Sequence, residues 1–212
     1  MNFDPPEEAR ELVELARSFA RSDLARTEVE IDRIADPVEA YASEALGAFR
    51  KQVRAIGFHQ ILLPAEIGGL DLSPLTYFLV LEQLTTGGAG LGLVMQADLL
   101  GVGMAVRRRT THPVFEEYVS AFVDDAEGDH SGAWAITEPD VGCDIYSRSA
   151  SFGVRATPTA GGGGFVINGA KSSWCSNGWL ADMLCVMINV DPDAGMDGTG
   201  VFLIPASWPG IT

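Results

Sequence analysis

Two short segments in the second half of the chain combine hydroxyl, indole and backbone groups in a way that suits ligand binding. In residues 134–144, WAITEPDVGCD, a predicted strand breaks at Glu-Pro and continues into a loop that contains glycine. Such a break leaves backbone N–H groups and the Thr137 hydroxyl free to bind something outside the sheet. In residues 168–178, NGAKSSWCSNG, the indole of Trp174 lies two residues before the hydroxyl of Ser176. Each segment alone also fits a buried tryptophan beside a polar turn, so only the two together indicate a site.

Other patterns that could do chemistry have simpler explanations. Residues 164–172, GFVINGAKS, nearly match a phosphate-binding P-loop, but Ala170 separates the second glycine from the lysine. An Asn-Gly hairpin explains the same residues without phosphate. The three histidines, at positions 59, 112 and 130, have no metal-ligand spacing with the cysteines. We therefore predict no metal site, and no serine or cysteine hydrolase motif is present.

The composition limits the partners and the compartment. The 212-residue chain carries 14 Lys+Arg against 29 Asp+Glu, a formal charge of −15, so its field repels nucleic acid. The three cysteines form no CxxC pair, which favours reduced thiols. The first eight residues, MNFDPPEE, lack the basic and apolar regions of a signal peptide. We expect a cytoplasmic protein that does not bind nucleic acid.

One apolar segment, residues 87–106, is long enough to suggest a membrane-spanning helix. Asp98 lies in its middle, and a carboxylate near the centre of a bilayer costs roughly 2.5–3.5 kcal/mol on insertion scales. A helix that is apolar on all sides also occurs in the core of a large soluble domain. We predict a buried helix and no membrane span.

The elements that must position these residues change type near Gly128. Before it, helical spacing and caps predict a helix that starts at Asp4, a second over 37–56 that ends at Gly57, a third that starts at Ser73, and a short one over 113–122. In the third helix the spacing puts Tyr77, Phe78, Leu81 and Leu84 on one side. We expect an all-α N-terminal domain over residues 1–127.

After Gly128, short runs rich in β-branched residues alternate with turn residues. They predict strands within 153–157, 164–167, 183–190 and 200–204. Asn168-Gly169 is the strongest hairpin signal, and the glycine run 161–164 reads as a flexible connection. The predicted fold class is α+β, with residues 128–212 forming an antiparallel β-barrel or sandwich. The last strand stops with little after it, so we expect this β domain to be incomplete, with an open sheet edge.

The two segments resemble motifs of the acyl-CoA dehydrogenase family. The first resembles T-E-P-x-x-G-S-D, matched at Thr137, Glu138, Pro139, Gly142 and Asp144. The second resembles N-G-x-K-x-W-I-T-N-G, matched at Asn168, Gly169, Lys171, Trp174, Asn177 and Gly178. Residues 63–69, LPAEIGG, are similar to the L-P-x-x-x-G-G loop of the family's helical domain. In two places the chain departs from the motifs, because Cys143 replaces a serine and one extra residue separates Lys171 from Trp174.

The resemblance implies an FAD site. It places Trp134, Ile136 and Thr137 along the edge of the isoalloxazine ring, with Gly142 and Cys143 in the same loop. It places Trp174 beside the ring and the Ser176 hydroxyl near flavin N5. Fixed hydroxyl and amide donors stabilise the negative charge that hydride transfer brings to the flavin. The implied acyl pocket includes Leu93, Met95 and Leu99, with Cys143 on the substrate side, although plain core packing explains the three helical residues equally well.

The function that follows from the resemblance is α,β-desaturation of an acyl-CoA thioester, with hydride transfer to flavin N5, as part of fatty acid metabolism. The family's catalytic carboxylate belongs to a C-terminal helical domain, and this chain ends before it. We therefore assign no catalytic residue and expect a homo- or hetero-oligomer that supplies the missing domain. One alternative is a non-catalytic partner subunit or degenerate fragment that docks another chain through its open sheet edge. A weaker alternative is a flavin monooxygenase of the same superfamily.

Overall fold

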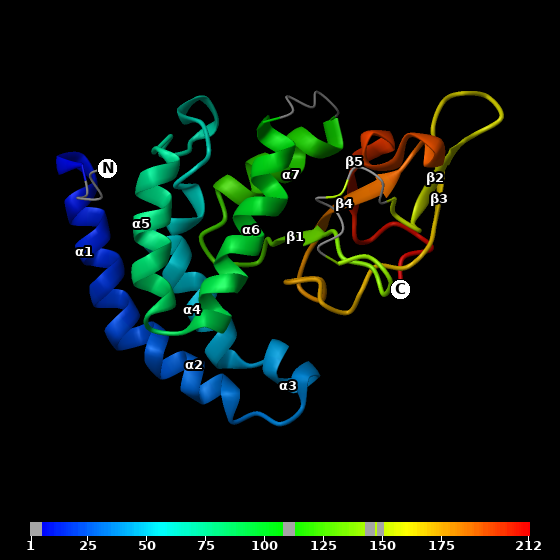
Figure 1. Ribbon diagram of the computed structural model, residues 1–212. Coiled ribbons are helices and arrows are strands. Elements are labelled where there is room, and N and C mark those ends of the chain that lie inside the picture. The colour runs from blue at the N-terminus through cyan, green and yellow to red at the C-terminus, as the bar shows by residue number, and fades with distance from the viewer. Residues whose placement is uncertain (1–5, 108–112, 143–146, 148–150) are drawn as a thin grey trace. The chain divides into compact units, whose positions relative to one another are not determined.

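The computed structural model describes residues 6–107, 113–142, 147 and 151–212 (Figure 1). Two compact units divide the chain, Met1–Ser131 and Gly132–Thr212. The first unit is helical and the second contains every strand of the described residues, so the predicted α+β class is confirmed. The division lies close to the predicted domain boundary after residue 127.

The helical unit begins with four elements in succession. They are η1 (Glu7–Ala9), α1 (Arg10–Phe19), the π-helical turn η2 (Ala20–Leu24) and α2 (Ala25–Asp32). The predicted cap at Asp4 lies outside the described residues. Val13, Ala16 and Phe19 of α1 are buried, whereas Leu15 is exposed. One apolar stripe of α1 therefore faces the core. The spacing predicts Leu12, Leu15, Ala16 and Phe19 on this stripe; Ala16 and Phe19 are buried, but Val13 is buried in place of Leu15.

The single helix predicted over residues 37–56 is two helices, α3 (Pro37–Tyr41) and α4 (Glu44–Ile56). The chain is extended at Ser43, whose hydroxyl accepts a hydrogen bond from the backbone N–H of Leu46 at 3.3 Å. This serine N-cap starts a new helix, and the apolar periodicity across the break concealed it. The predicted end is confirmed, because Gly57 has φ +83° in the left-handed region.

A loop with two short helical turns, η3 (Phe58–Gln60) and η4 (Ala65–Ile67), follows α4. Gly69 explains the glycine pair in this loop, because a Cβ atom there would lie 1.9 Å from the backbone oxygen of Leu63. Any side chain at this position would force the loop apart. Only glycine permits so close an approach of two backbone segments.

Three helices complete the unit, α5 (Pro74–Thr85), α6 (Ala89–Arg107) and α7 (Pro113–Val123). Helix α5 starts where predicted, with the Ser73 hydroxyl accepting from the N–H of Thr76 at 3.1 Å. The predicted placing of Phe78 with Tyr77 is wrong, because Phe78 is 60% exposed while Tyr77 is buried. Helix α5 packs against both α1 and α6 (Figure 1). Because α5 lies against both α1 and α6, its side chains Tyr77, Val80 and Leu84 are buried.

Helix α6 contains most of the long apolar segment. Among the described residues no helix is long and apolar enough to span a membrane. Asp98 of α6 is 5% exposed and is engaged in polar contacts described below.

The second unit is built on one mixed five-stranded sheet. Its strands are β1 (Gly132–Ala135), β2 (Arg155–Pro158), β3 (Phe165–Asn168), β4 (Met183–Asn189) and β5 (Thr199–Pro205), with η6 (Pro192–Gly198) between the last two. The strand order is β1-β4-β2-β3, and β5 also pairs with β4. Strands β1 and β2 run parallel to β4, whereas β3 runs antiparallel to β2 and β5 antiparallel to β4. The sequence predicts an antiparallel β domain, but the sheet is mixed, because two of its strand pairs are parallel.

The hairpin of this unit forms elsewhere than predicted. Strands β2 and β3 are joined through residues 159–164, where the N–H of Thr159 donates to the Gly164 oxygen at 2.9 Å and Gly162 has φ +68°. Asn168 is the last residue of β3, and no strand directly follows Gly169. Gly169 serves a close approach instead, because its φ is +135° and a Cβ atom there would lie 2.8 Å from Cα of Val154. The glycine run is thus the turn of the hairpin.

Candidate functional site

The two sequence segments singled out above lie side by side in the β unit. The backbone N–H of Ser172 donates to the Thr137 oxygen at 2.8 Å. Farther along, the Cys175 thiol donates weakly to the Trp134 oxygen at 3.6 Å. Residues 134–138 and 171–175 are therefore neighbours, although more than thirty residues separate them in sequence.

The first segment turns sharply after β1. The N–H of Glu138 donates to the Val141 oxygen at 3.0 Å, and the N–H of Val141 returns a bond to the Glu138 oxygen at 3.2 Å. Pro139 and Asp140, at the tip of this turn, are exposed. The reciprocal pair satisfies the backbone locally, so the turn holds its shape without a further strand beside it.

A buried ion pair joins the two segments. Lys171 Nζ lies 2.8 Å from Glu138 Oε1 and also donates to the Ile136 oxygen at 2.9 Å. Glu138 is 6% exposed and accepts from the N–H groups of Gly153 at 2.6 Å and Val154 at 3.1 Å. Both carboxylate oxygens of Glu138 therefore accept hydrogen bonds, which offsets the cost of burying its charge.

Lys171 occupies an unusual position for a cation. Its ammonium group lies 3.9 Å from the centre of the Phe152 ring, a cation–π contact with a fully buried aromatic. Burial lowers the pKa of Lys171, and the hydrogen bond and charge of Glu138 oppose that effect. Glu138 and Lys171 match positions of the two family motifs, but the motifs alone assign them no role. Lys171 is the only cation in residues 168–178, and that lone charge was the available signal for a partner in the other segment.

The second segment is also tied to the start of β1. Asn177 is buried, has φ +60°, and donates from Nδ2 to the Gly132 oxygen at 3.3 Å. Asparagine tolerates this left-handed conformation better than most residues do. Burial raises the pKa of the Cys175 thiol, although the charge of Lys171 opposes the shift. This thiol, bonded to a backbone oxygen, packs between the two segments.

The predicted ring-facing residues differ in exposure. Trp174 is 84% exposed, the indole nitrogen of Trp134 is buried without a hydrogen-bond partner among the described residues, and Ile136, Thr137 and Ser176 are partly buried. Gly142 is exposed, and Cys143 lies outside the described residues. An exposed indole and an unpaired indole nitrogen, both on the joined segments, are compatible with a planar ligand that has acceptor atoms.

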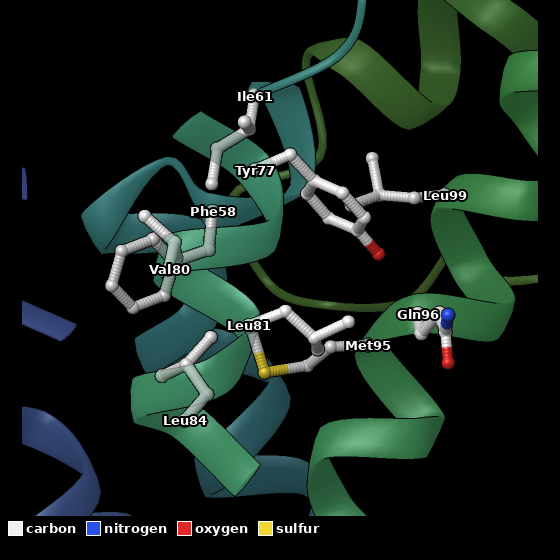
Figure 2. A pocket seen from close by; sticks show the side chains of 9 residues that line it. All are labelled: Phe58, Ile61, Tyr77, Val80, Leu81, Leu84, Met95, Gln96 and Leu99. Atoms are coloured by element: carbon white, nitrogen blue, oxygen red, sulfur yellow. The ribbon is translucent and has the colours of Figure 1, made fainter. Parts of the chain in front are cut away.

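The predicted acyl-pocket residues belong to the helical unit and lie differently from one another. Met95 and Leu99 line a hollow between α5 and α6 (Figure 2). Leu93 is 49% exposed and does not line it. The hollow is lined almost entirely by apolar side chains, so it suits a hydrocarbon or a small neutral group.

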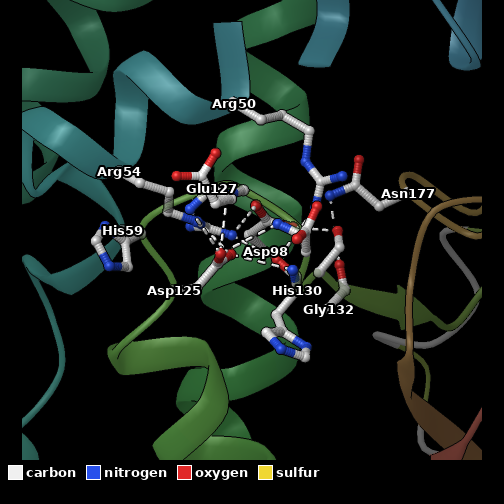
Figure 3. Close-up of polar contacts among 12 residues, drawn as sticks. Arg50, Arg54, His59, Asp98, Asp125, Glu127, His130, Gly132 and Asn177 are labelled. Atoms are coloured by element: carbon white, nitrogen blue, oxygen red, sulfur yellow. Dashed lines mark hydrogen bonds and ion pairs between the residues drawn. The ribbon is translucent and has the colours of Figure 1, made fainter. Parts of the chain in front are cut away.

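A second buried charge cluster lies in the helical unit (Figure 3). Arg54 of α4 pairs with Asp98 of α6 at 3.3 Å and with Asp125 at 3.1 Å, and it also donates to the His130 oxygen. Asp125 accepts backbone N–H groups from four successive residues, Glu127, Gly128, Asp129 and His130. Of this cluster, the sequence indicates only Asp98, as a charge inside an apolar helix.

Charge and burial shift two titrating groups in this cluster. Burial acts to raise the pKa of Asp125, but the N–H groups of His130, Asp129 and Gly128 together with Arg54 outweigh it and lower the pKa. Burial beside Arg54 lowers the pKa of His59 to about 4, so this histidine is neutral near pH 7. In the described part of the chain, no group of three or more His, Cys, Asp or Glu side chains could hold a metal ion.

Comparison with known proteins identifies the family. Residues 6–126 match the family described as "Acyl-CoA dehydrogenase, N-terminal domain". The chain belongs to the acyl-CoA dehydrogenase family. It is 30% identical over 206 residues to the mitochondrial 2-methylacyl-CoA dehydrogenase of Solanum tuberosum, which covers 96% of this chain and 45% of that protein. It is 28% identical to the human mitochondrial short-chain specific acyl-CoA dehydrogenase, covering 98% of this chain and 46% of that protein.

A solved structure of the same fold contains the cofactor. The FAD complex of PigA superposes with a TM-score of 0.75 at 28% identity, and the match covers 99% of this chain and 51% of PigA. The chain thus spans about half the length of the relatives it matches, and the match includes both its helical unit and its sheet. The acyl-CoA dehydrogenase relationship accounts for the order of the two units.

Proposed function

We propose that the protein carrying this chain is an FAD-dependent acyl-CoA dehydrogenase, and that this chain supplies the helical unit and the flavin-facing part of the sheet. The observation that carries the proposal is the set of contacts between residues 134–138 and residues 171–175. On the second of these segments the side chain of Trp174 is 84% exposed. A large aromatic surface is costly to leave in water, and a planar ring would cover it.

The residues present fit a flavin in their chemistry. Trp174 would lie against the ring and exclude water from it, while the hydroxyls of Thr137 and Ser176 would donate hydrogen bonds to its acceptor atoms. The unpaired Nε1–H of Trp134 offers one more donor. Bound FAD would supply the hydride acceptor for the α,β-desaturation of an acyl-CoA thioester. The Lys171–Glu138 pair would keep these donors in place before the cofactor binds, so little reorganisation would accompany the reaction.

The remaining parts of the proposal rest on the family relationship. The base that removes the α-proton, and further contacts to FAD, would come from a C-terminal helical domain in the same protein or in a partner chain. We propose an oligomer in the cytoplasm that takes part in fatty acid metabolism. The two relatives named above differ in acyl specificity by their names, so the acyl group needs its own argument.

Flavin retention by a pair of tryptophan variants tests the proposal. The protein carrying Trp174→Ala is purified beside one carrying Trp208→Ala, which removes another exposed indole of the same unit. We expect Trp174→Ala to weaken FAD binding by about tenfold or more, measured by flavin fluorescence titration, and Trp208→Ala to leave it unchanged. A wild-type protein that binds no FAD, or equal retention by both variants, contradicts the proposal.

A second candidate function is favoured by one strand. Phe165, Val166 and Ile167 of β3 are each 36–53% exposed, and among the described strands β3 pairs only with β2. A non-catalytic subunit could use this apolar edge to dock another chain. Absorption spectra separate the two candidates, because a colourless complex that forms through β3 supports docking and a yellow protein supports the dehydrogenase.

A further inference from the structure

The hollow between α5 and α6 contains an unpaired polar group. Nine side chains line the hollow, and seven of them are purely aliphatic, thioether or phenyl groups. The two exceptions are the hydroxyl of Tyr77 on α5 and the amide of Gln96 on α6. Figure 2 shows the Tyr77 ring crossing from α5 towards α6, with its oxygen in the space beside Leu99 and Gln96.

The Tyr77 hydroxyl is buried without a partner. Tyr77 is 7% exposed, and its oxygen has no hydrogen-bond partner among the described residues. Buried hydroxyl groups in folded proteins almost always have one, because an unpaired group has lost its bonds to water and gained nothing in return. Burial raises the pKa of Tyr77 to about 12, so the group stays protonated and keeps a hydrogen to donate. Apart from the amide of Gln96, the Tyr77 hydroxyl is therefore the one polar group among the described side chains that line the hollow, in otherwise apolar surroundings.

We propose that this hollow binds the far end of the acyl group, and that Tyr77 selects acyl groups that carry an oxygen atom there. The inference rests on the proposed function, since it assigns a substrate class to the acyl site of that function. It goes beyond the resemblance, which implies only that Met95 and Leu99 belong to an acyl pocket.

The size and lining of the hollow define the class further. It has room for roughly one water-sized group, so a long hydrocarbon tail does not fit without displacing side chains. A hydroxyl, ether or keto oxygen accepts a hydrogen bond from Tyr77, whereas a methyl group leaves the donor unpaired. A site built to hydrogen-bond its ligand rejects the analogue that lacks the polar atom far more strongly than an apolar pocket rejects an extra one. We therefore expect a short acyl group that ends in an oxygen function.

Matched pairs of acyl-CoA thioesters test the inference. Within each pair the two thioesters have the same short straight chain, and one ends in a methyl group while the other ends in a hydroxymethyl group. The full-length holoprotein should show a kcat/KM about tenfold higher for the hydroxylated member at one chain length. Tyr77→Phe should abolish this preference by raising KM for the hydroxylated member alone, because the bond forms equally in the bound and transition states.

A control variant and a melting-temperature measurement keep the outcomes distinct. Tyr41→Phe, which removes the hydroxyl of an exposed tyrosine on α3, should leave the preference unchanged. If methyl-ended thioesters are preferred at every length, or if Tyr77→Phe keeps the preference, the hollow holds only water and the inference is wrong while the proposed function stands. If no CoA thioester is oxidised or raises the melting temperature of the holoprotein, the proposed function fails and takes the inference with it.

Discussion

The two units each bury a cation against a fully buried phenylalanine, but they neutralise it differently. In the helical unit the Arg54 guanidinium lies 4.5 Å from the centre of the Phe122 ring and faces two carboxylates, those of Asp98 and Asp125. In the β unit the Lys171 ammonium lies 3.9 Å from the Phe152 ring and faces one carboxylate, that of Glu138. The β-unit pair joins one cation to one carboxylate, whereas in the helical unit one guanidinium bonds to two carboxylates, and Arg50 also donates to the His130 oxygen that Arg54 contacts.

The difference shows what each cluster does. The two carboxylates of the helical unit have further donors, because four backbone N–H groups converge on Asp125 and the Ser131 hydroxyl donates to Asp98. Those donors belong to residues 127–131, at the end of the helical unit, so the cluster attaches this segment to α4 and α6. The balanced pair in the β unit joins two loops instead. The planar fork of arginine suits the first task and the point charge of lysine suits the second.

The largest expected effect comes from removing the shared cation. Arg54→Met leaves two buried carboxylates without their cation, and we expect the free energy of unfolding of the helical unit to fall by about 3–5 kcal/mol. Urea denaturation followed by far-UV circular dichroism measures the loss. A loss below about 1 kcal/mol would mean that the amide donors alone stabilise both carboxylates.

The corresponding change in the β unit should cost less. Lys171→Met leaves Glu138 with two backbone donors, Gly153 and Val154, so we expect a loss of about 2–4 kcal/mol together with weaker FAD binding. Fluorescence-monitored denaturation and flavin titration measure the two effects.

A double variant sharpens the comparison between the clusters. Adding Glu138→Leu to Lys171→Met removes the whole balanced pair and should restore much of the stability. Adding Asp125→Leu to Arg54→Met should restore little, because Asp98 keeps its charge and the donors around position 125 lose their acceptor. Equal recovery in both units would show that the second carboxylate of the helical cluster makes no difference to its stability.

The pH dependence of stability should also separate the units. His59 has a folded pKa of about 4 against an ordinary value of 6.5. The unfolded chain therefore binds more protons between these values, and the stability contributed by the neutral ring is complete above pH 6.5 and is lost as the pH falls to about 4. We expect a decrease of up to about 3 kcal/mol across this window.

His59→Gln, which does not titrate, should flatten the curve over that range. Asp125 does not imitate the effect, because its pKa is lowered from 3.8 and its contribution disappears only at still lower pH. Urea denaturation at a series of pH values tests this expectation. An unchanged slope in the histidine variant would show that folding does not lower the pKa of His59.

The smallest effect is expected at an exposed pair. Lys51 contacts Glu127, and the two side chains are 56% and 61% exposed. Solvent and salt screen such a pair, so Lys51→Met should change the unfolding free energy by less than about 1 kcal/mol. This variant is also the control for Lys171→Met and Arg54→Met, and a loss as large as theirs would mean that burial does not distinguish the three cations.

Local chemistry allowed parts of the fold to be predicted. The Ser73 cap and the left-handed Gly57 act within one helical turn of their own position, and both were found where the sequence indicated them. The break at Ser43 was missed because the apolar spacing continues across it. Asn168-Gly169 predicts a hairpin because that dipeptide favours one, but the pairing of β3 with β2 uses the glycines after Thr159.

In the candidate site, too, local features could be predicted from the sequence and long-range contacts could not. The two segments could be found from residue types and motif spacing, and the family follows from the same residues. The Lys171–Glu138 and Arg54–Asp98 pairs could not be predicted, because their members lie 33 and 44 residues apart and no local pattern links them.

The amino-acid sequence by itself determined the helical and β regions, many of the helix ends and the family, since these depend on periodicity, capping and short motifs. The tertiary structure alone decided which charges are buried together, which glycines permit close contact and that the Tyr77 hydroxyl has no hydrogen-bond partner among the described residues. Burial and long-range pairing are properties of the packed chain, and their energies arise only when distant segments exclude water from one another.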